Sequence, residues 1–144
     1  MTGMKKPWKC PKCGREFEKT NQQHSCVIYP LDRHFTGKEE IARPLYNRLK
    51  ENIEKGIGPV KVESLPCCIH FVVAHSAYTF AAVYALKGKI RVHFGSDREI
   101  KSPRIDKSAK TSASKYMHSV NISSEKEMDG ELMSWLKEAY NMKK

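Results

Sequence analysis

The sequence predicts an α+β domain in which helices pack on one face of a mainly antiparallel sheet of about five strands. Two observations support this prediction. Apolar residues recur at helical spacing near residues 44–56 and 132–139, whereas residues 58–94 and 115–123 alternate with a period close to two. The predicted order is helix, four strands, loop, strand and helix, and short turns between consecutive strands favour antiparallel pairing.

The first helix is expected over residues 44–56, PLYNRLKENIEKG. Leu45, Leu49 and Ile53 lie on one apolar stripe, and Gly56 is a common residue at a helix end. Because only one side of this helix is apolar, it needs a surface to cover, and a sheet would supply one.

Four strands are expected between residues 58 and 94, with the sequences VKVES, CIHFVV, YTFAAVYAL and KIRVHF. All four are rich in β-branched and aromatic residues. Lys87 and Gly88 separate the last two strands and suit a tight hairpin turn. Residues 95–114 contain many Ser and Lys residues with little apolar periodicity, so we expect a long basic loop there.

A fifth strand over residues 115–123 and a final helix complete the predicted domain. We expect the helix to open at Ser124, because Glu127 three residues later forms a capping box with it. In that arrangement each side chain bonds a free backbone amide of the other residue. The apolar face of this helix consists of Leu132, Trp135, Leu136 and Ala139.

The length of 144 residues suits one domain with its own core and a small appendage. The composition changes after Cys26, so we place the boundary between residues 1–27 and residues 28–144. The chain has 26 Lys and Arg residues against 16 Asp and Glu residues, a net charge of +10 that favours polyanions as partners. Much of this excess lies in residues 87–115.

The protein is expected to be soluble and cytoplasmic. Its start, MTGMKKPWKC, is basic without the apolar run of a secretory signal, and the longest apolar region is interrupted by His70 and His75. Five cysteines, an odd number with three in one cluster, fit a reducing compartment better than a set of disulfides.

The segment CPKCGREFEKTNQQHSC has the spacing of a zinc site. Cys10 and Cys13 place two thiolates on one turn, and His24 and Cys26 point to the same side of an extended segment. Such a Cys3His set closes a tetrahedron around Zn2+, and a closed site is structural rather than catalytic. The few apolar residues of this segment could hardly fold without a metal. His34 is the alternative fourth ligand, although it lies beyond the expected domain boundary.

The stretches WKCPKCGREFEKTNQQHSC, LDRHFTGK, LYNRL and ELMSWLKEAY follow one another along the chain. Together they resemble the domain of unknown function 5655 family, many of whose members begin with a zinc-finger-like segment. The resemblance implies zinc on Cys10, Cys13, His24 and Cys26, an α+β domain behind it, and no established reaction. Members often have an Arg just before the Phe-Ala motif, where this sequence has His75.

Side-chain alternation indicates which histidines face the core. His118 shares its side of the fifth strand with Val120, and His75 shares its side of the second strand with Val73. Two inward histidines on neighbouring strands would line a pocket for an anionic ligand, with Arg104 at its mouth. The alternative is that both are core histidines bonded to backbone groups or Tyr hydroxyls.

The fourth predicted strand has a basic outer side, because its basic residues alternate with core residues. Together with the following loop, this side could bind the phosphates of a polyanion, and a plain solvated surface is the alternative. No base-stacking aromatic residues are evident there, so single-strand recognition of the usual sheet type is not supported. The polyanion-binding candidates are Lys89, Arg91, Lys101, Lys107 and Lys110.

Two patterns with catalytic associations are rejected. Residues 112–115, SASK, match an acylating-hydrolase pattern but lie in a stretch full of Ser and Lys. Cys67 and Cys68 are adjacent, so in a strand they would face opposite sides. We therefore predict a non-enzymatic zinc-binding protein that binds nucleic acid or another polyanion. The alternative is a pocket protein or enzyme acting on a small anionic ligand.

Overall fold

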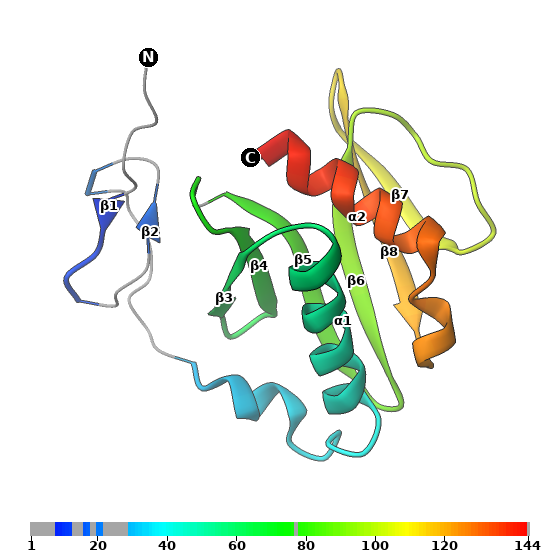
Figure 1. Ribbon diagram of the computed structural model, residues 1–144, viewed down its shortest axis with the longest axis horizontal. Helices are drawn as coiled ribbons and strands as arrows, with labels where there is room; N and C mark the ends of the chain where they lie inside the picture. The colour runs from blue at the N-terminus through cyan, green and yellow to red at the C-terminus, as the bar shows by residue number, and fades with distance from the viewer. Residues whose placement is uncertain (1–7, 13–15, 18–19, 22–28, 77, 144) are drawn as a thin grey trace.

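The structure is a computed structural model that describes residues 8–12, 16–17, 20–21, 29–76 and 78–143 (Figure 1). Two short strands, β1 and β2, pair antiparallel near the start of the chain. A sheet with two helices follows. In chain order the elements are β1 (Trp8–Lys9), β2 (Glu16–Phe17), η1 (Leu31–Phe35), α1 (Ala42–Gly56), β3 (Val60–Ser64), β4 (Ile69–Val73), β5 (Thr79–Leu86), β6 (Lys89–Ser96), β7 (Ile105–Ser112), β8 (Lys115–Ile122), η2 (Glu125–Glu127) and α2 (Gly130–Lys143).

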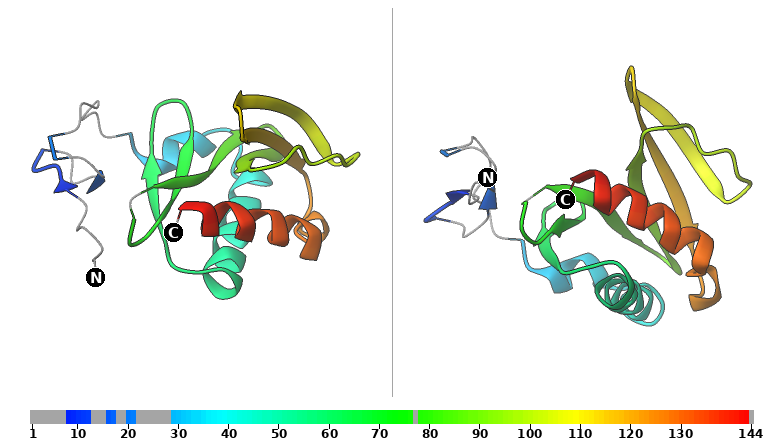
Figure 2. Two further views of the ribbon diagram at one scale, coloured as in Figure 1. Left: turned by 90° about the horizontal axis from the view of Figure 1, so that it is seen from above. Right: turned by 45° about the horizontal axis from the view of Figure 1, so that its top comes forward.

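Six strands form one antiparallel sheet in the order β3-β4-β5-β6-β8-β7. Both helices lie on the same face of this sheet, and each contacts β5 and β6 (Figures 1 and 2). The predicted α+β class, with helices packed on one face of an antiparallel sheet, is therefore confirmed. The sheet has one strand more than the sequence predicts.

The extra strand is β7, which lies within the predicted loop. It pairs with β8 at the edge of the sheet, and all of its residues after Ile105 are exposed. Because only Ile105 of β7 packs against the core, the sequence of this strand lacks the apolar alternation by which the other strands were predicted. Its lysines suit an edge strand, since charge discourages pairing with a further chain.

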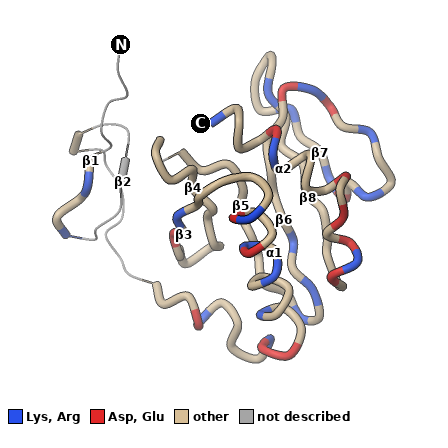
Figure 3. Tube along the Cα trace, viewed as in Figure 1, with Lys and Arg blue, Asp and Glu red and all other residues tan. Residues whose placement is uncertain are grey.

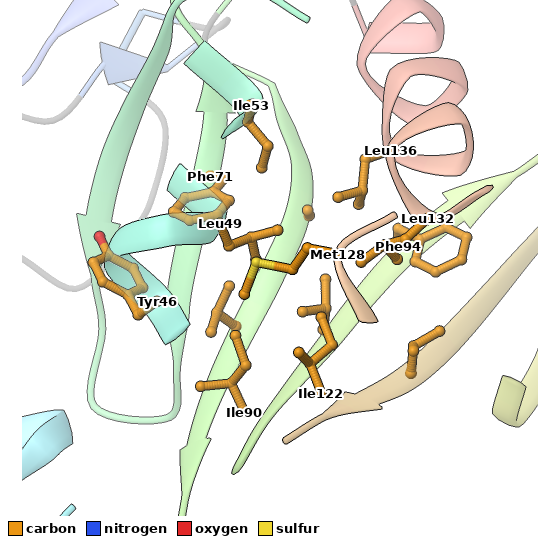
Figure 4. Close-up of a cluster of buried hydrophobic side chains, with 14 of the residues drawn as sticks. Tyr46, Leu49, Ile53, Phe71, Ile90, Phe94, Ile122, Met128, Leu132 and Leu136 are labelled. Atoms are coloured by element: carbon orange, nitrogen blue, oxygen red, sulfur yellow. The ribbon is translucent and has the colours of Figure 1, made fainter. Parts of the chain in front are cut away.

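The core lies between the sheet and the two helices (Figure 4). Leu49 and Ile53 of α1 and Leu132 and Leu136 of α2 are each fully buried there. Complete burial of such a side chain contributes about 1.5–3 kcal/mol relative to exposure. The strands contribute core residues that include Phe71, Ile90, Phe94 and Ile122.

The first helix and the hairpin turn after β5 are confirmed. Helix α1 begins at Ala42, two residues before the predicted start, and ends at Gly56 as predicted. Between β5 and β6, Gly88 has a φ of +78°, a left-handed conformation that glycine adopts at no steric cost. In the described part of the chain, neither helix is long and apolar enough to cross a membrane.

The predicted start of the last helix was wrong. The Glu127 carboxylate does accept a hydrogen bond from the backbone N–H of Ser124, at 3.2 Å, but this arrangement caps the short turn η2. Helix α2 begins at Gly130, where Oδ1 of Asp129 accepts the N–H of Leu132 at 3.2 Å. Asp129 therefore takes the N-terminal capping role predicted for Ser124.

Cys67 and Cys68 also depart from the expectation. They lie in the turn before β4, and their Sγ atoms are 3.2 Å apart, because the alternation of a strand does not apply there. Cys67 is exposed and Cys68 is buried. Burial and the neighbouring Cys67 thiol raise the pKa of Cys68 to about 11.

Candidate functional site

The two faces of the sheet differ in what covers them. Phe71, Val83, Val92 and Val120 point into the core with the helices. We call the opposite face, which neither helix covers, the open face (Figure 2). Because neighbouring strands are in register, one row of Cα partners crosses the open face from β4 to β7. This row consists of His70, Ala82, His93, Ser119 and Lys107.

A cleft of about 430 Å³ opens where β5 and β6 separate. Their pairing ends at Ala81 and Phe94, so the first residues of β5 and the last of β6 diverge. On the open face the cleft is lined by His70, Tyr84 and His93. Further residues of β5 and β6, the C-terminal end of α2 and the hairpin of β7 and β8 also line it.

A second, smaller hollow of about 250 Å³ lies beside the cleft, over β6, β8 and β7. Arg91 and Lys107 line it, so we call it the basic hollow. His93 lines both cavities and forms a wall that they share. The cleft and the basic hollow are therefore adjacent.

The electrostatic character of this site is positive. Among the described residues that line the two cavities there is no Asp or Glu, and there are four Lys or Arg. The Arg91 Nε–H donates to the neutral Oδ1 of Asn121 at 3.0 Å, and no described carboxylate forms an ion pair with Arg91. Figure 3 shows Lys and Arg along β6 and in the segments that follow it. Arg91 therefore presents a charge that has no ion-pair partner among the described residues.

Tyr84 and His93 form an aromatic pair on the open face, with ring centroids 4.7 Å apart. Burial, assisted by the charge of Arg91, lowers the pKa of His93 below its ordinary value. Burial and the hydrogen bond with Cys68 raise the pKa of Tyr84. Both rings therefore favour their neutral forms, and Nε2 of His93 is buried with no hydrogen-bond partner among the described residues.

His118 lies on the core side of β8, as predicted, and is 1% exposed. Its Nδ1 lies 2.7 Å from Oγ of Ser108, and its Nε2 lies 3.0 Å from Oγ of Ser96. The ring also contacts Phe94, with centroids 5.6 Å apart. Because both ring nitrogens have partners within the fold, this geometry is that of a core histidine.

Arg104 lies just before β7 and is held by acidic groups at the start of α2. Its guanidinium lies 2.7 Å from the Asp129 carboxylate and 3.2 Å from that of Glu131, and it donates to the backbone carbonyl of Glu127. Burial acts to lower the pKa of Arg104, but the bonds to Asp129 and Glu131 outweigh it and raise the pKa. Arg104 thus ties the segment before β7 to α2.

The structure does not bring His75, Arg104 and His118 together. Strand β4 ends at Val73, so His75 lies in the following turn and is exposed. Strands β4 and β8 are separated by β5 and β6, and the expectation that they are neighbours was wrong. At about 4.8 Å per strand, this separation is roughly 14 Å.

Of the polyanion-binding candidates, the structure places Lys89, Arg91 and Lys107 on the open face. Lys110 belongs to the other side of β7, with its Nζ 5.9 Å from the Tyr116 ring centroid. Lys101 is exposed in the segment between β6 and β7. The expectation that the open face lacks base-stacking aromatic residues was wrong, because Tyr84 of β5 lies there beside His93. Its alternation with Val83 and Ala85 could have indicated this position.

The zinc prediction falls mainly outside the described residues, where Cys13, His24 and Cys26 lie. Cys10 is described, and it is buried directly after β1. The described part of the chain contains no group of three or more His, Cys, Asp or Glu residues able to hold a metal. His34 belongs to the main domain, with its Nε2 3.1 Å from Oγ of Ser64.

These features define an α+β protein with a helix-covered antiparallel sheet and a basic open face. The chain belongs to the family described as Domain of unknown function (DUF5655), whose model matches residues 31–143. Neither the curated proteins nor the solved structures include a significant match to this chain. The family match begins at η1 and ends in α2, so it includes the open face and not the predicted zinc segment.

Proposed function

We propose that this protein binds nucleic acid through the open face of its sheet. The observation that carries the proposal is the basic hollow, where Arg91 of β6 and Lys107 of β7 lie on either side of β8 with no described carboxylate in the lining. Phosphate groups are the ligands that such a surface attracts, because release of their counterions drives binding to Lys and Arg.

The charge distribution within the main domain supports this proposal. Arg98 and Arg104 are paired with acidic residues of α2 or of its start, whereas Arg91 is held in place by a neutral amide. An arginine fixed by Asn121 retains its charge and four further N–H donors for a ligand. Lys107 is exposed and adds a second positive charge to the same hollow, across β8 from Arg91.

The proposal is tested by fluorescence anisotropy with a labelled oligonucleotide at low salt. The double substitution Arg91→Gln and Lys107→Gln should weaken binding about tenfold or more, since each charged contact contributes about 1 kcal/mol or more. The matched control is Lys126→Gln with Lys137→Gln, which removes the same charge from η2 and α2. Equal losses in the two variants would show that only net charge matters and would reject the open face as the binding site.

We also propose that residues 1–27 hold one structural Zn2+ through Cys10, Cys13, His24 and Cys26. The donor set suits a closed tetrahedral site, and the described Cys10 is buried although few apolar groups surround it in sequence. The ion would supply the folding free energy that this segment cannot obtain from a core.

Elemental analysis of the purified protein should find about one zinc per chain, and Cys10→Ser should reduce that content strongly. The Cys67→Ser variant is the control, because Cys67 lies in the turn before β4. Zinc content near zero in the wild-type protein would contradict the assignment.

A further inference from the structure

We infer that the cleft between β5 and β6 receives an unpaired base of a single-stranded nucleic acid. This inference rests on the proposed function, because the phosphates beside that base would lie in the basic hollow. The bound base would contribute to the free energy of binding in addition to the contacts of the phosphates with Arg91 and Lys107.

The shape of the cleft supports a flat ligand. The separation of β5 from β6 leaves a cavity within the size range of small-molecule sites, and two of its lining residues, Ala82 and Gly95, have a small side chain or none. A Cβ added at Gly95 would lie 3.6 Å from the Tyr116 carbonyl oxygen, which is an ordinary contact. The backbone at Gly95 therefore leaves room for an added group.

The walls of the cleft offer aromatic surfaces. Tyr84 and His93 lie on one side of the cleft. His70 of β4 pairs with Ala82 of β5, which in turn pairs with His93 of β6. Base stacking on such rings tolerates any sequence, because every base has a π-face. The Oγ1 of Thr79 lies 3.4 Å from Nδ1 of His70 and adds a polar group to the rim.

The position of the cleft relative to the basic hollow supports a nucleotide rather than an apolar ligand. His93 separates the two cavities, so a base beside His93 has its phosphate within reach of Arg91 and Lys107. Lys115 and Lys143 line the cleft itself and complement the same negative charge. In a duplex the bases are stacked and paired, so only an unpaired base can enter.

The test compares two labelled probes with the full-length protein. One probe is an oligothymidylate about 12 nucleotides long, within the site sizes of single-strand binding proteins. The other is an abasic oligonucleotide of equal length and charge. We expect the base-containing probe to bind about tenfold more tightly than the abasic probe, from the free energy of base stacking.

Filling the cleft should remove this difference without changing any charge. Ala82→Leu should bind both probes with the affinity that the wild-type protein shows for the abasic probe. Gly95→Val is the second variant. If circular dichroism shows that Ala82→Leu is unfolded, Gly95→Val tests whether filling the cleft removes the preference for the base-containing probe. Tyr84→Leu should reduce the preference as well, because it removes one stacking surface.

Equal affinity of the wild-type protein for both probes would overturn the inference. If Arg91→Gln with Lys107→Gln still weakened binding of both probes, the proposed function would stand without a base site. If neither probe bound the wild-type protein, the proposed function would itself fail. A preference for the base-containing probe that persists in a folded Ala82→Leu or Gly95→Val variant would place the base elsewhere.

Discussion

The two faces of the sheet use the same kinds of polar residue in different ways. On the helix-covered face, His118 bonds two serines, and Arg104 pairs with Asp129 and Glu131. On the open face, Arg91 has a neutral amide as its partner, and His93 has a buried nitrogen without one among the described residues. A histidine or arginine whose partners lie within the fold maintains the fold. Arg91 instead keeps guanidinium N–H groups without a described partner and can donate them to a ligand.

This difference leads to opposite expectations for substitutions on the two faces. Changes at His118 or Arg104 should lower the free energy of unfolding. Arg104 lines neither cavity, so its change should leave the affinity of the folded protein unchanged. Changes at Arg91 or Lys107 should lower affinity and leave stability within about 0.5 kcal/mol.

The largest expected effect on stability is that of His118→Ala. This change opens a cavity beside Phe94 and leaves the hydroxyls of Ser96 and Ser108 without their ring partner. We expect a loss of about 2–4 kcal/mol in the free energy of unfolding, measured by urea denaturation. A variant that keeps its stability but loses nucleic-acid binding would reverse the roles of the two faces.

A smaller effect is expected for Arg104→Ala, which leaves Asp129 and Glu131 without their shared cation. The Arg104 side chain is 21% exposed, and we expect a loss of about 1–3 kcal/mol from its charged hydrogen bonds. Arg98→Ala is the matched control, because the Arg98 side chain is 55% exposed and pairs with Glu138.

Loss of the exposed Arg98–Glu138 ion pair should lower the free energy of unfolding by only about 0–1 kcal/mol. Urea denaturation at neutral pH measures both variants under the same conditions. Equal losses would mean that Arg104 contributes no more than an ordinary surface ion pair.

The smallest expected effect is the contribution of His93 to the pH dependence of stability. Because burial lowers the pKa of His93 in the folded protein, the unfolded chain takes up the proton first as the pH falls below about 6.5. Stability should therefore decline as the pH falls through that value, and His93→Gln should remove part of the decline. Thermal denaturation between about pH 7.5 and about pH 5 measures this decline in stability. Both limits lie about one unit or more from the ordinary pKa of histidine.

His34 provides the comparison for this experiment, since burial lowers its pKa as well. His34→Gln should remove a separate part of the decline, and the double variant should show the flattest profile. A wild-type profile that is flat over this range would contradict the burial of both rings.

Local patterns in the sequence were sufficient for several features of the fold. The stripe of Leu45, Leu49 and Ile53 predicted α1, and alternation around Val92 placed Arg91 away from the core. Such features depend on neighbours along the chain, so periodicity reveals them. The α+β class followed from the order of these elements.

The features that the sequence did not predict depend on contacts between distant segments. Strand β7 is polar and is held by pairing with β8. The partners of His118 come from β6 and β7, and the cleft exists because the pairing of β5 with β6 ends at Ala81. None of these arrangements produces a periodic pattern in one segment, so only the folded sheet shows them.

The measurement that tests the difference between the two faces most directly is the salt dependence of nucleic-acid affinity. The logarithm of the affinity for a single-stranded probe should fall linearly with the logarithm of salt concentration. In Arg91→Gln with Lys107→Gln the slope should be shallower by about 1.4, at about 0.7 for each lost phosphate contact. An unchanged slope in this variant, with normal stability, would contradict the open face as the site of binding.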